Sequence, residues 1–372
     1  MVNPDADGAE PDVFILSRPT GSVVANGVRR GFVDARAAAE ALRTGAVDAV
    51  VGAIPFDVDD PAALIAPGTL VHSARPVAGS TGAPHQVLSM SLHPDQSAHR
   101  DRVERAIKRI ADGELDKVVL ARSVDMTLDP AVDVDDLIRA LAHGNSEGNA
   151  FGIDIGAARG SGGWLLGASP ELLVRKQGRT VTCHPYAGSA PRSADPATDR
   201  AAADALAASA KDRTEHAFVV DYLRDRLAPH CAEITVPSSP ELRSTGEIWH
   251  LATPIHGILR DDAMTALDLA LLLSPTPAVC GTPSDLAAQF IRDVEGERGL
   301  YGGAIGWCDG AGDGEWMVTI RCLELTADRR SLRTWAGGGI VAQSDPGAEV
   351  DETTAKLRTV FNALGIEQAA NR

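Results

Sequence analysis

Short stretches in which apolar and polar residues alternate recur along the chain, and this pattern predicts β-strands. Glycine and proline residues separate the stretches, as they do at turns between strands. In the first half of the chain the predicted strands cover residues 13–18, 47–56, 88–92, 117–126 and 164–169. In the second half they cover residues 234–237, 247–259, 299–309, 315–325 and 332–341. The last quarter is therefore predicted to be especially rich in strands.

Other segments carry apolar residues at helical spacing or are rich in alanine, and they predict helices. In residues 94–112, the apolar side chains of Val103, Ile107 and Ile110 recur at helical intervals. Residues 198–227 are alanine-rich and charged, which predicts one helix or a broken helical pair. Further helices are predicted over residues 34–44, 133–143 and 264–272, and after the turn at residues 344–347.

Predicted strands follow one another through hairpin-like turns as often as through helices. This order favours the α+β class with largely antiparallel sheets. Because the chain shows no internal repeat and no linker longer than a few residues, we predict that residues 13–372 form one composite domain. Residues 1–12 are polar and acidic, which predicts a disordered leader.

Composition narrows the classes of partner. The 372 residues include 35 basic and 51 acidic side chains, a formal net charge of −16 at pH 7. This charge argues against nucleic acid or an anionic membrane surface as partner. The five cysteines form no CxxC pair, so neither a disulfide framework nor a structural zinc site is predicted. The sequence has no signal-peptide pattern and no apolar run of about 18 residues, so we expect a cytoplasmic protein.

One stretch near the end of the chain, residues 336–357, combines a bare backbone with carboxylates. Three consecutive glycines, residues 337–339, leave main-chain N–H groups uncovered, so an oxyanion could approach them. Glu349, Glu352 and Lys356 follow at positions i, i+3 and i+7 of the predicted helix, and they share one face. The face is either a solvated one with a single ion pair or a site for a hard cation such as Mg2+.

Two single residues each allow two interpretations. Lys117 begins an apolar strand, where a lysine can extend its amine from the strand edge or can be a desolvated general base. Glu171 follows a Ser-Pro turn and precedes an apolar pair. Its carboxylate could cap the turn, or it could lie in an apolar pocket and act as an acid.

Four further residues carry indications of a site that differ in strength. Glu215 and His216 lie in a charged run beside an apolar helical face, which is typical of a helix start but also of a site. His250 alternates with apolar residues in a strand, a pattern more typical of a core histidine. Arg321 lies inside an otherwise apolar strand and should therefore have an anionic partner.

Nine motifs occur in a fixed order along the chain: KVVLAR, GASPELL, AGSAPR, DRTEH, WHL, SPTPAVCGTP, YGGAIGW, VTIR and GGGIVAQSDPGAEVDETTAK. This set resembles the chorismate-utilising enzymes, which include anthranilate synthase component I and the aminodeoxychorismate, salicylate and isochorismate synthases. The resemblance covers about residues 13–364, with the catalytic motifs in about 100–364. It implies two large, mainly antiparallel β-sheets packed face to face, with helices outside.

Within this family the sequence is most similar to the isochorismate synthases. Lys117 matches the lysine that activates water in that branch, and residues 50–57, VVGAIPFD, resemble a stretch typical of it. Ala278 stands where the aminating enzymes tend to carry threonine. Salicylate synthases share the lysine, so salicylate synthesis with pyruvate lyase activity is the first alternative. An aminating enzyme, or a protein that binds chorismate without converting it, are the others.

The resemblance also implies a role for each candidate residue when water attacks C2 of chorismate and the C4 hydroxyl leaves. Lys117 is the predicted base and Glu171 the predicted acid, with His250 near the C4 side of the ring. Burial would favour the neutral amine and the protonated carboxyl that these roles require. The expected Mg2+ ligands are Glu215, Glu349 and Glu352. The expected substrate-binding residues are Gly188, Ser189, Ala278, Arg321, Gly337, Gly338 and Lys356.

The implied partners are few. Chorismate is the expected small-molecule substrate, no glutaminase subunit is expected, and relatives without one are commonly monomers. The product would feed siderophore, menaquinone or salicylate synthesis. Tyr186 and Cys280 depart from the family pattern, since an aliphatic residue and a serine are expected at these positions. Both neighbour the predicted pocket.

Overall fold

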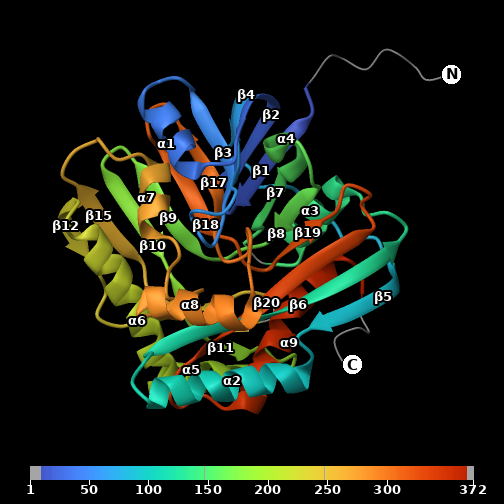
Figure 1. The fold of residues 1–372 in the computed structure, drawn as a ribbon, viewed down its shortest axis with the longest axis vertical. Coiled ribbons are helices and arrows are strands. Elements are labelled where there is room, and N and C mark those ends of the chain that lie inside the picture. The colour runs from blue at the N-terminus through green and yellow to red at the C-terminus, as the bar shows by residue number, and fades with distance from the viewer. Residues whose placement is uncertain (1–9, 146, 247, 367–372) are drawn as a thin grey trace.

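The strands of the protein join into one long antiparallel network, seen in the upper and right parts of Figure 1. The computed structural model describes residues 10–145, 147–246 and 248–366. Within these residues sixteen strands follow one another edge to edge, and each neighbouring pair is antiparallel. The spatial order is β5 (Gln86–His93), β6 (Lys117–Asp129), β20 (Ser331–Ile340), β19 (Cys322–Leu325), β8 (Trp164–Gly167), β7 (Ala150–Asp154), β1 (Asp12–Arg18), β2 (Gly21–Phe32), β4 (Ala63–Ser73), β3 (Ala49–Ile54), β17 (Ala304–Asp309), β18 (Gly314–Val318), β9 (Leu172–Gln177), β10 (Thr180–His184), β15 (Ile255–Leu259) and β12 (Cys231–Thr235).

The remaining described strands are one short strand and a small separate sheet. The short strand β16 (Gly281–Thr282) pairs with the start of β6. A separate three-stranded sheet consists of β11 (Tyr186–Pro191), β14 (Ile248–Ala252) and β13 (Glu241–Ser244), with β14 in the middle. This small sheet carries several of the predicted site residues.

Side-chain caps begin most of the described helices. Asp34, Asp95, Asp133, Ser209 and Asp345 each accept a hydrogen bond from a backbone N–H in the first turn. Such a cap stabilises a helix by about 1 kcal/mol. The described helices are α1 (Ala35–Arg43), α2 (Gln96–Ala111), α3 (Val134–His143), α4 (Ile155–Arg159), α5 (Pro196–Ala208), α6 (Ala210–Leu227), α7 (Ala266–Leu273), α8 (Ser284–Glu295) and α9 (Pro346–Ala363).

The apolar core occupies both the space between strand layers and the space beneath the helices. Side chains of β1, β7, β3 and β17 meet in one cluster that includes Phe14, Phe151 and Ile305. A second cluster lies beneath α1, α6 and α7, and a third beneath α3 and α9. This arrangement agrees with the predicted α+β fold, in which helices lie outside packed sheet layers.

The pairing of β6 with β20 is the longest contact that bears on the site. It runs from Thr127 opposite Ser331 to Val118 opposite Ile340. Helices α2 and α9 pack against these two strands, below them in Figure 1. The register places the glycines at 337–339 opposite residues 119–121, a few residues from Lys117.

Several predicted elements differ from the structure, and helix α8 and strands β2 and β4 were not predicted. The predicted strand over residues 315–325 is broken, because Arg321 has a left-handed backbone with φ of 51° and separates β18 from β19. The predicted strand over residues 247–259 is divided between Ala252 and Ile255, since Pro254 cannot donate a ladder hydrogen bond. Strand β1 already begins at Asp12, and residues 1–9 of the predicted leader lie outside the described residues.

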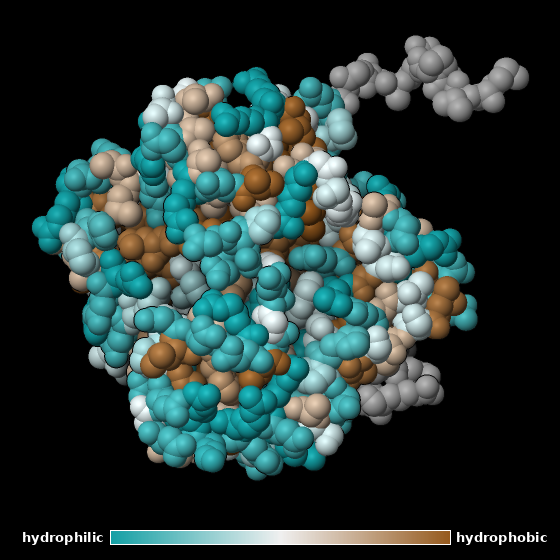
Figure 2. Space-filling view, in the orientation of Figure 1, coloured by the Kyte–Doolittle hydropathy of each residue, from teal (hydrophilic) through white to brown (hydrophobic). Residues whose placement is uncertain are grey.

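Polar residues cover most of the face seen in Figure 2, with apolar residues in separate small groups. Within the described ranges, the large apolar side chains that remain exposed come from different elements. They are Val28, Val33, Val71, Leu88, Ile258 and Leu286. Such scattered exposure is ordinary for a folded protein.

Candidate active site

A small cavity of about 60 Å³ lies where β20, β11, β14, α6 and α9 meet. Ten of the thirteen predicted site residues line it: Glu171, Gly188, Ser189, Glu215, His250, Ala278, Arg321, Gly337, Glu352 and Lys356. Lys117, Gly338 and Glu349 lie behind this wall, in contact with its residues. The sequence motifs therefore converge on one place, although they span more than two hundred residues.

The glycines of β20 make room for two carboxylates. A Cβ atom at Gly339 would lie 2.0 Å from Oε1 of Glu215, and one at Gly338 would lie 2.8 Å from Oε2 of Glu349. Real Cβ atoms do not approach oxygen this closely, so a larger residue would displace the carboxylates. The sequence predicted that these glycines expose backbone to a ligand, and the structure adds that they let acidic side chains approach the strand.

Helix α9 brings Glu349, Glu352 and Lys356 to the cavity wall. Asp345 caps the helix, and buried Arg122 donates hydrogen bonds to the carbonyl of Val350 and, at 2.6 Å, to Thr354. These contacts tie the helix to β6, the strand that carries Lys117. The acidic residues therefore have a fixed orientation toward β20.

Each of the three predicted metal-binding glutamates has a lysine partner. Lys117 Nζ lies 3.3 Å from Glu215, Lys211 Nζ lies 2.9 Å from Glu349, and Lys356 Nζ lies 2.6 Å from Glu352. Ser189 also donates a hydrogen bond of 2.6 Å to Glu352, and Lys356 donates one to the carbonyl of Gly337.

Burial and charge set different protonation tendencies for the two acids of α9. Burial raises the pKa of Glu349 to about 7, and the nearby negative charge of Glu352 acts in the same direction. Burial would also raise the pKa of Glu352, but the charge of Lys356 and hydrogen bonds from Lys356 and Ser189 outweigh it and lower that pKa. The second oxygen of Glu349, Oε2, is buried and has no hydrogen bond of normal geometry with another described residue.

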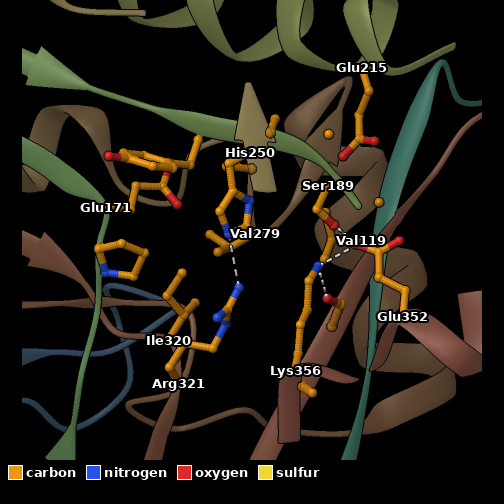
Figure 3. Close-up of a pocket in the computed structure, with 18 of the residues that line it drawn as sticks. Val119, Glu171, Ser189, Glu215, His250, Val279, Ile320, Arg321, Glu352 and Lys356 are labelled. Atoms are coloured by element: carbon orange, nitrogen blue, oxygen red, sulfur yellow. Dashed lines mark hydrogen bonds and ion pairs between the residues drawn. The ribbon is translucent and has the colours of Figure 1, made fainter. Parts of the chain in front are cut away.

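Glu171 has the environment predicted for an acid. It precedes β9 and is buried, and burial raises the pKa of its carboxyl to about 8 against the opposing effects of the Tyr186 backbone N–H and Lys117. At neutral pH the group therefore carries a proton that it can donate. In the view of Figure 3 it lies across the pocket from Glu215 and Glu352.

His250 and Arg321 form a buried pair between these two sides (Figure 3). Nη2 of Arg321 lies 3.3 Å from Nε2 of His250. Burial and the charge of Arg321 hold the pKa of His250 well below its usual value, so the ring is neutral and accepts a hydrogen bond from the guanidinium. Burial lowers the pKa of Arg321 to about 10, so the guanidinium still carries its charge at neutral pH.

The predicted anionic partner of Arg321 is not among its direct contacts in the described part of the chain. The hydrogen-bond partner that the structure gives is His250, and the carboxylates of Glu352 and Glu171 act only through longer-range attraction. A buried guanidinium with this arrangement can bind an anion that enters the cavity.

Sequence analysis missed several parts of the site. Tyr301 and Trp335 stack with ring centroids 5.5 Å apart and form an aromatic wall, and Lys211 pairs with Glu349. Tyr301 lies in the YGGAIGW motif, whereas Trp335 lies two residues before the glycine stretch, in a predicted strand but outside the motifs. Tyr186, predicted to neighbour the pocket, lines it and packs edge-on against His250.

The oxygen-rich donor set fits a hard cation, and the unpartnered Oε2 of Glu349 offers it a free ligand atom. In the arrangement that the described residues adopt, however, no three acidic, histidine or cysteine side chains are grouped closely enough to hold a metal ion. Lysine amines lie against the three glutamates instead.

Comparison with known proteins identifies the family. A family model described as chorismate binding enzyme matches residues 70–365. The chain belongs to the chorismate-binding enzymes. The predicted family is thus confirmed, and so is its α+β fold.

Relatives of this chorismate-binding enzyme cover nearly its full length. MenF of Mycobacterium tuberculosis, whose name gives isochorismate synthase as an inferred activity, is 47% identical and aligns with 95% of this chain and 96% of its own. Isochorismate synthase DhbC of Bacillus subtilis is 42% identical over 96% of this chain and 95% of its own. A crystal structure of DhbC from Bacillus anthracis, described as an inferred 2,3-dihydroxybenzoate-specific isochorismate synthase, has a TM-score of 0.88 at 36% identity and covers 95% of this chain and 96% of that one.

No helix in the described ranges is both long and apolar enough to cross a membrane.

Proposed function

We propose that this chorismate-binding enzyme is an isochorismate synthase, which converts chorismate reversibly to isochorismate. The observation that carries the proposal is the placement of a protonated acid, Glu171, across the cavity from Glu215 and the lysine paired with it. The predicted reaction needs an acid and a base on opposite sides of the ring. The names of the relatives at 42–47% identity support the same activity.

The proposed reaction exchanges one hydroxyl for another. Water adds its oxygen to C2 of chorismate and gives a proton to Lys117, while the ring double bonds shift. The C4 hydroxyl takes the proton of Glu171 and leaves as water, so the net change is an isomerisation. In the reverse direction Glu171 accepts the proton and Lys117 returns one, which microscopic reversibility requires.

The metal belongs to the proposal as well. Glu215, Glu349 and Glu352 would hold Mg2+, with Glu349 supplying the carboxylate oxygen that has no partner. When bound, the ion offsets the repulsion between these carboxylates and an anionic substrate. Lys356, bonded to Glu352 and to the carbonyl of Gly337, orients that ligand.

The substrate is an acid with two carboxylates, and the cavity supplies cationic and backbone donors for them. Arg321 would bind one carboxylate, and neutral His250 would hold the guanidinium in place rather than move a proton. Gly188, Ser189, Ala278, Gly337 and Gly338 would complete the binding wall. Gly188 has a φ of 76° and permits the close approach of Asp212 on α6, which keeps Glu215 at the cavity.

The decisive experiment is incubation of the purified protein with chorismate and Mg2+, with and without a chelator. Products are separated by chromatography, and pyruvate is assayed separately. Isochorismate that appears only with metal, without pyruvate, is the expected result. Salicylate with pyruvate would assign the chain to the salicylate synthases, and product formed only with ammonium salts would assign it to the aminating enzymes. Equal activity in Lys117→Met and wild type would refute the role of Lys117.

The expected assembly is also part of the proposal. We expect a cytoplasmic monomer that works without a glutaminase subunit. Sedimentation of the active protein tests this expectation, since a dimeric active species would contradict it.

A further inference from the structure

Of the lysines in the three lysine–glutamate pairs, Lys211 has the side chain most exposed to solvent. Its side chain is 27% exposed, compared with 0% for Lys117 and 15% for Lys356. Lys117 is enclosed at the start of β6, and Lys356 is bonded to both Glu352 and the carbonyl of Gly337. Lys211 is therefore the amine that can leave its carboxylate for water without disturbing a strand or losing a second bond to the backbone.

The position of Lys211 on its helix is electrostatically unfavourable apart from its contact with Glu349. It lies in the first turn of α6, one residue after Ala210, where the helix dipole disfavours a cation. The 2.9 Å contact with a nearly fully buried carboxylate outweighs this effect. The ammonium is also attracted by Glu215 and Glu352, after Glu349. It thus lies in the combined field of all three glutamates.

We propose that Lys211 is a built-in counter-ion, which balances the charge of Glu349 before metal binds and which leaves that carboxylate for water when the metal binds. This inference rests on the metal site of the proposed function. Three carboxylates near one another in a mostly buried site would repel one another without a cation. Lys117 and Lys356 each lie against one of them, and Lys211 lies against the third.

The contact between Lys211 and Glu349 affects how tightly the metal binds. A cation at the free Oε2 of Glu349 lies beside the ammonium that donates to Oε1 of the same carboxylate. The two positive charges repel each other, so the amine of Lys211 turns to water. Part of the free energy of metal binding is therefore offset by the loss of the hydrogen bond between Lys211 and Glu349. Lys211 therefore lowers the affinity of the site for the metal. It also stabilises the unloaded site, because it balances the negative charge of Glu349.

The test measures Mn2+ binding to the full chain without substrate, by electron paramagnetic resonance of the free ion. Lys211→Met removes the amine but keeps the length of the side chain, and it should bind Mn2+ about tenfold more tightly than wild type, a change of about 1.4 kcal/mol. Lys211→Arg keeps the charge and should bind no more tightly than wild type. Lys108→Met removes a charge from an exposed position on α2 and serves as the matched control.

A second readout follows the unloaded protein. In a chelator, Lys211→Met should melt at a lower temperature than wild type and Lys108→Met, because its glutamates lack the third cation. Mn2+ should then raise its melting temperature by more than it raises that of wild type. Unchanged or weaker Mn2+ affinity in Lys211→Met overturns the inference.

The two proposals fail separately. If wild type makes isochorismate with Mg2+ while Lys211→Met binds Mn2+ as wild type does, only the counter-ion role is wrong. If wild type makes no isochorismate but Lys211→Met binds Mn2+ more tightly, the counter-ion role stands and the reaction assignment falls.

Discussion

The amine of Lys117 lies 3.3 Å from a carboxylate oxygen of Glu215, within a strand start that is closed to solvent. The proposed base is thereby joined directly to a proposed metal ligand, although the two residues are 98 positions apart in the sequence (215 − 117). Lys117 Nζ has no hydrogen bond that meets normal geometry, so the ion pair with Glu215 is its main polar contact among the described residues. A change at one residue should therefore affect the other.

Gly339→Ala tests this connection. The added Cβ would overlap Oε1 of Glu215, which has to turn away from Lys117 because the glutamate tip is more flexible than the strand. We expect isochorismate formation to fall by at least about tenfold and Mn2+ binding to weaken, with a change in folding stability near 1 kcal/mol. Steady-state kinetics and thermal melts check this expectation.

Gly144→Ala is the control for that variant. Gly144 has a φ of −68°, and an added Cβ would meet only ordinary contacts. Its activity and metal binding should match wild type. Equal losses in the two variants would show that the effect is not local to Glu215.

Glu171→Gln should remove the acid while keeping the shape of the side chain. Because an amide cannot donate the proton that the C4 hydroxyl needs, the rate of isochorismate formation should fall by about 10² to 10⁴-fold. Binding of chorismate should change little, and equilibrium dialysis measures it. A variant with near wild-type turnover would exclude Glu171 as the acid.

The same substitution gives a stability prediction with a definite sign. The pKa of Glu171 is raised to about 8 in the folded protein, whereas an unfolded glutamate titrates near its model value of 4.5. Between these values the unfolded chain has lost the proton and the folded protein still holds it, so the stability contributed by this group is present at low pH and falls as pH rises through about 8. Relative to wild type, Glu171→Gln should therefore gain stability as pH rises from about 4.5 to about 8, by about 5 kcal/mol in total. Urea unfolding of both proteins across this range measures the difference, and parallel curves would contradict it.

Arg321→Met should chiefly impair substrate binding. The guanidinium is charged and buried, and His250, its hydrogen-bond partner among the described residues, is neutral, so a substrate carboxylate is its natural counter-charge. We expect KM for chorismate to rise by about tenfold or more, with a smaller change in kcat. His250→Gln keeps a hydrogen-bond acceptor near the guanidinium and should show a milder form of the same KM effect. A loss confined to kcat in Arg321→Met would argue against carboxylate binding.

Motifs predicted which residues gather at the cavity, but not how those residues contact one another. Glu349, Glu352 and Lys356 could be placed on one face because helical spacing fixes their relation. The charged run that contains Glu215 is typical of a helix start but also of a site, and it does not predict the contact of Lys211, since its partner Glu349 is 138 positions away. Similarly, the pattern of residues 315–325 predicts one continuous strand. It does not predict the left-handed backbone at Arg321.

The register between β6 and β20 has a consequence for synthesis of the chain. Strand β6 is made early, but its partner β20 and the helix α9 that carries two of the acidic ligands come from the last part of the sequence. Until residue 340 has left the ribosome, one long edge of β6 lacks its partner, and an open strand edge of this kind favours pairing with other chains. Nascent chains that stop before β20 should therefore be inactive and prone to aggregate. Synthesis of β20 and α9 both covers the open edge of β6 and completes the site.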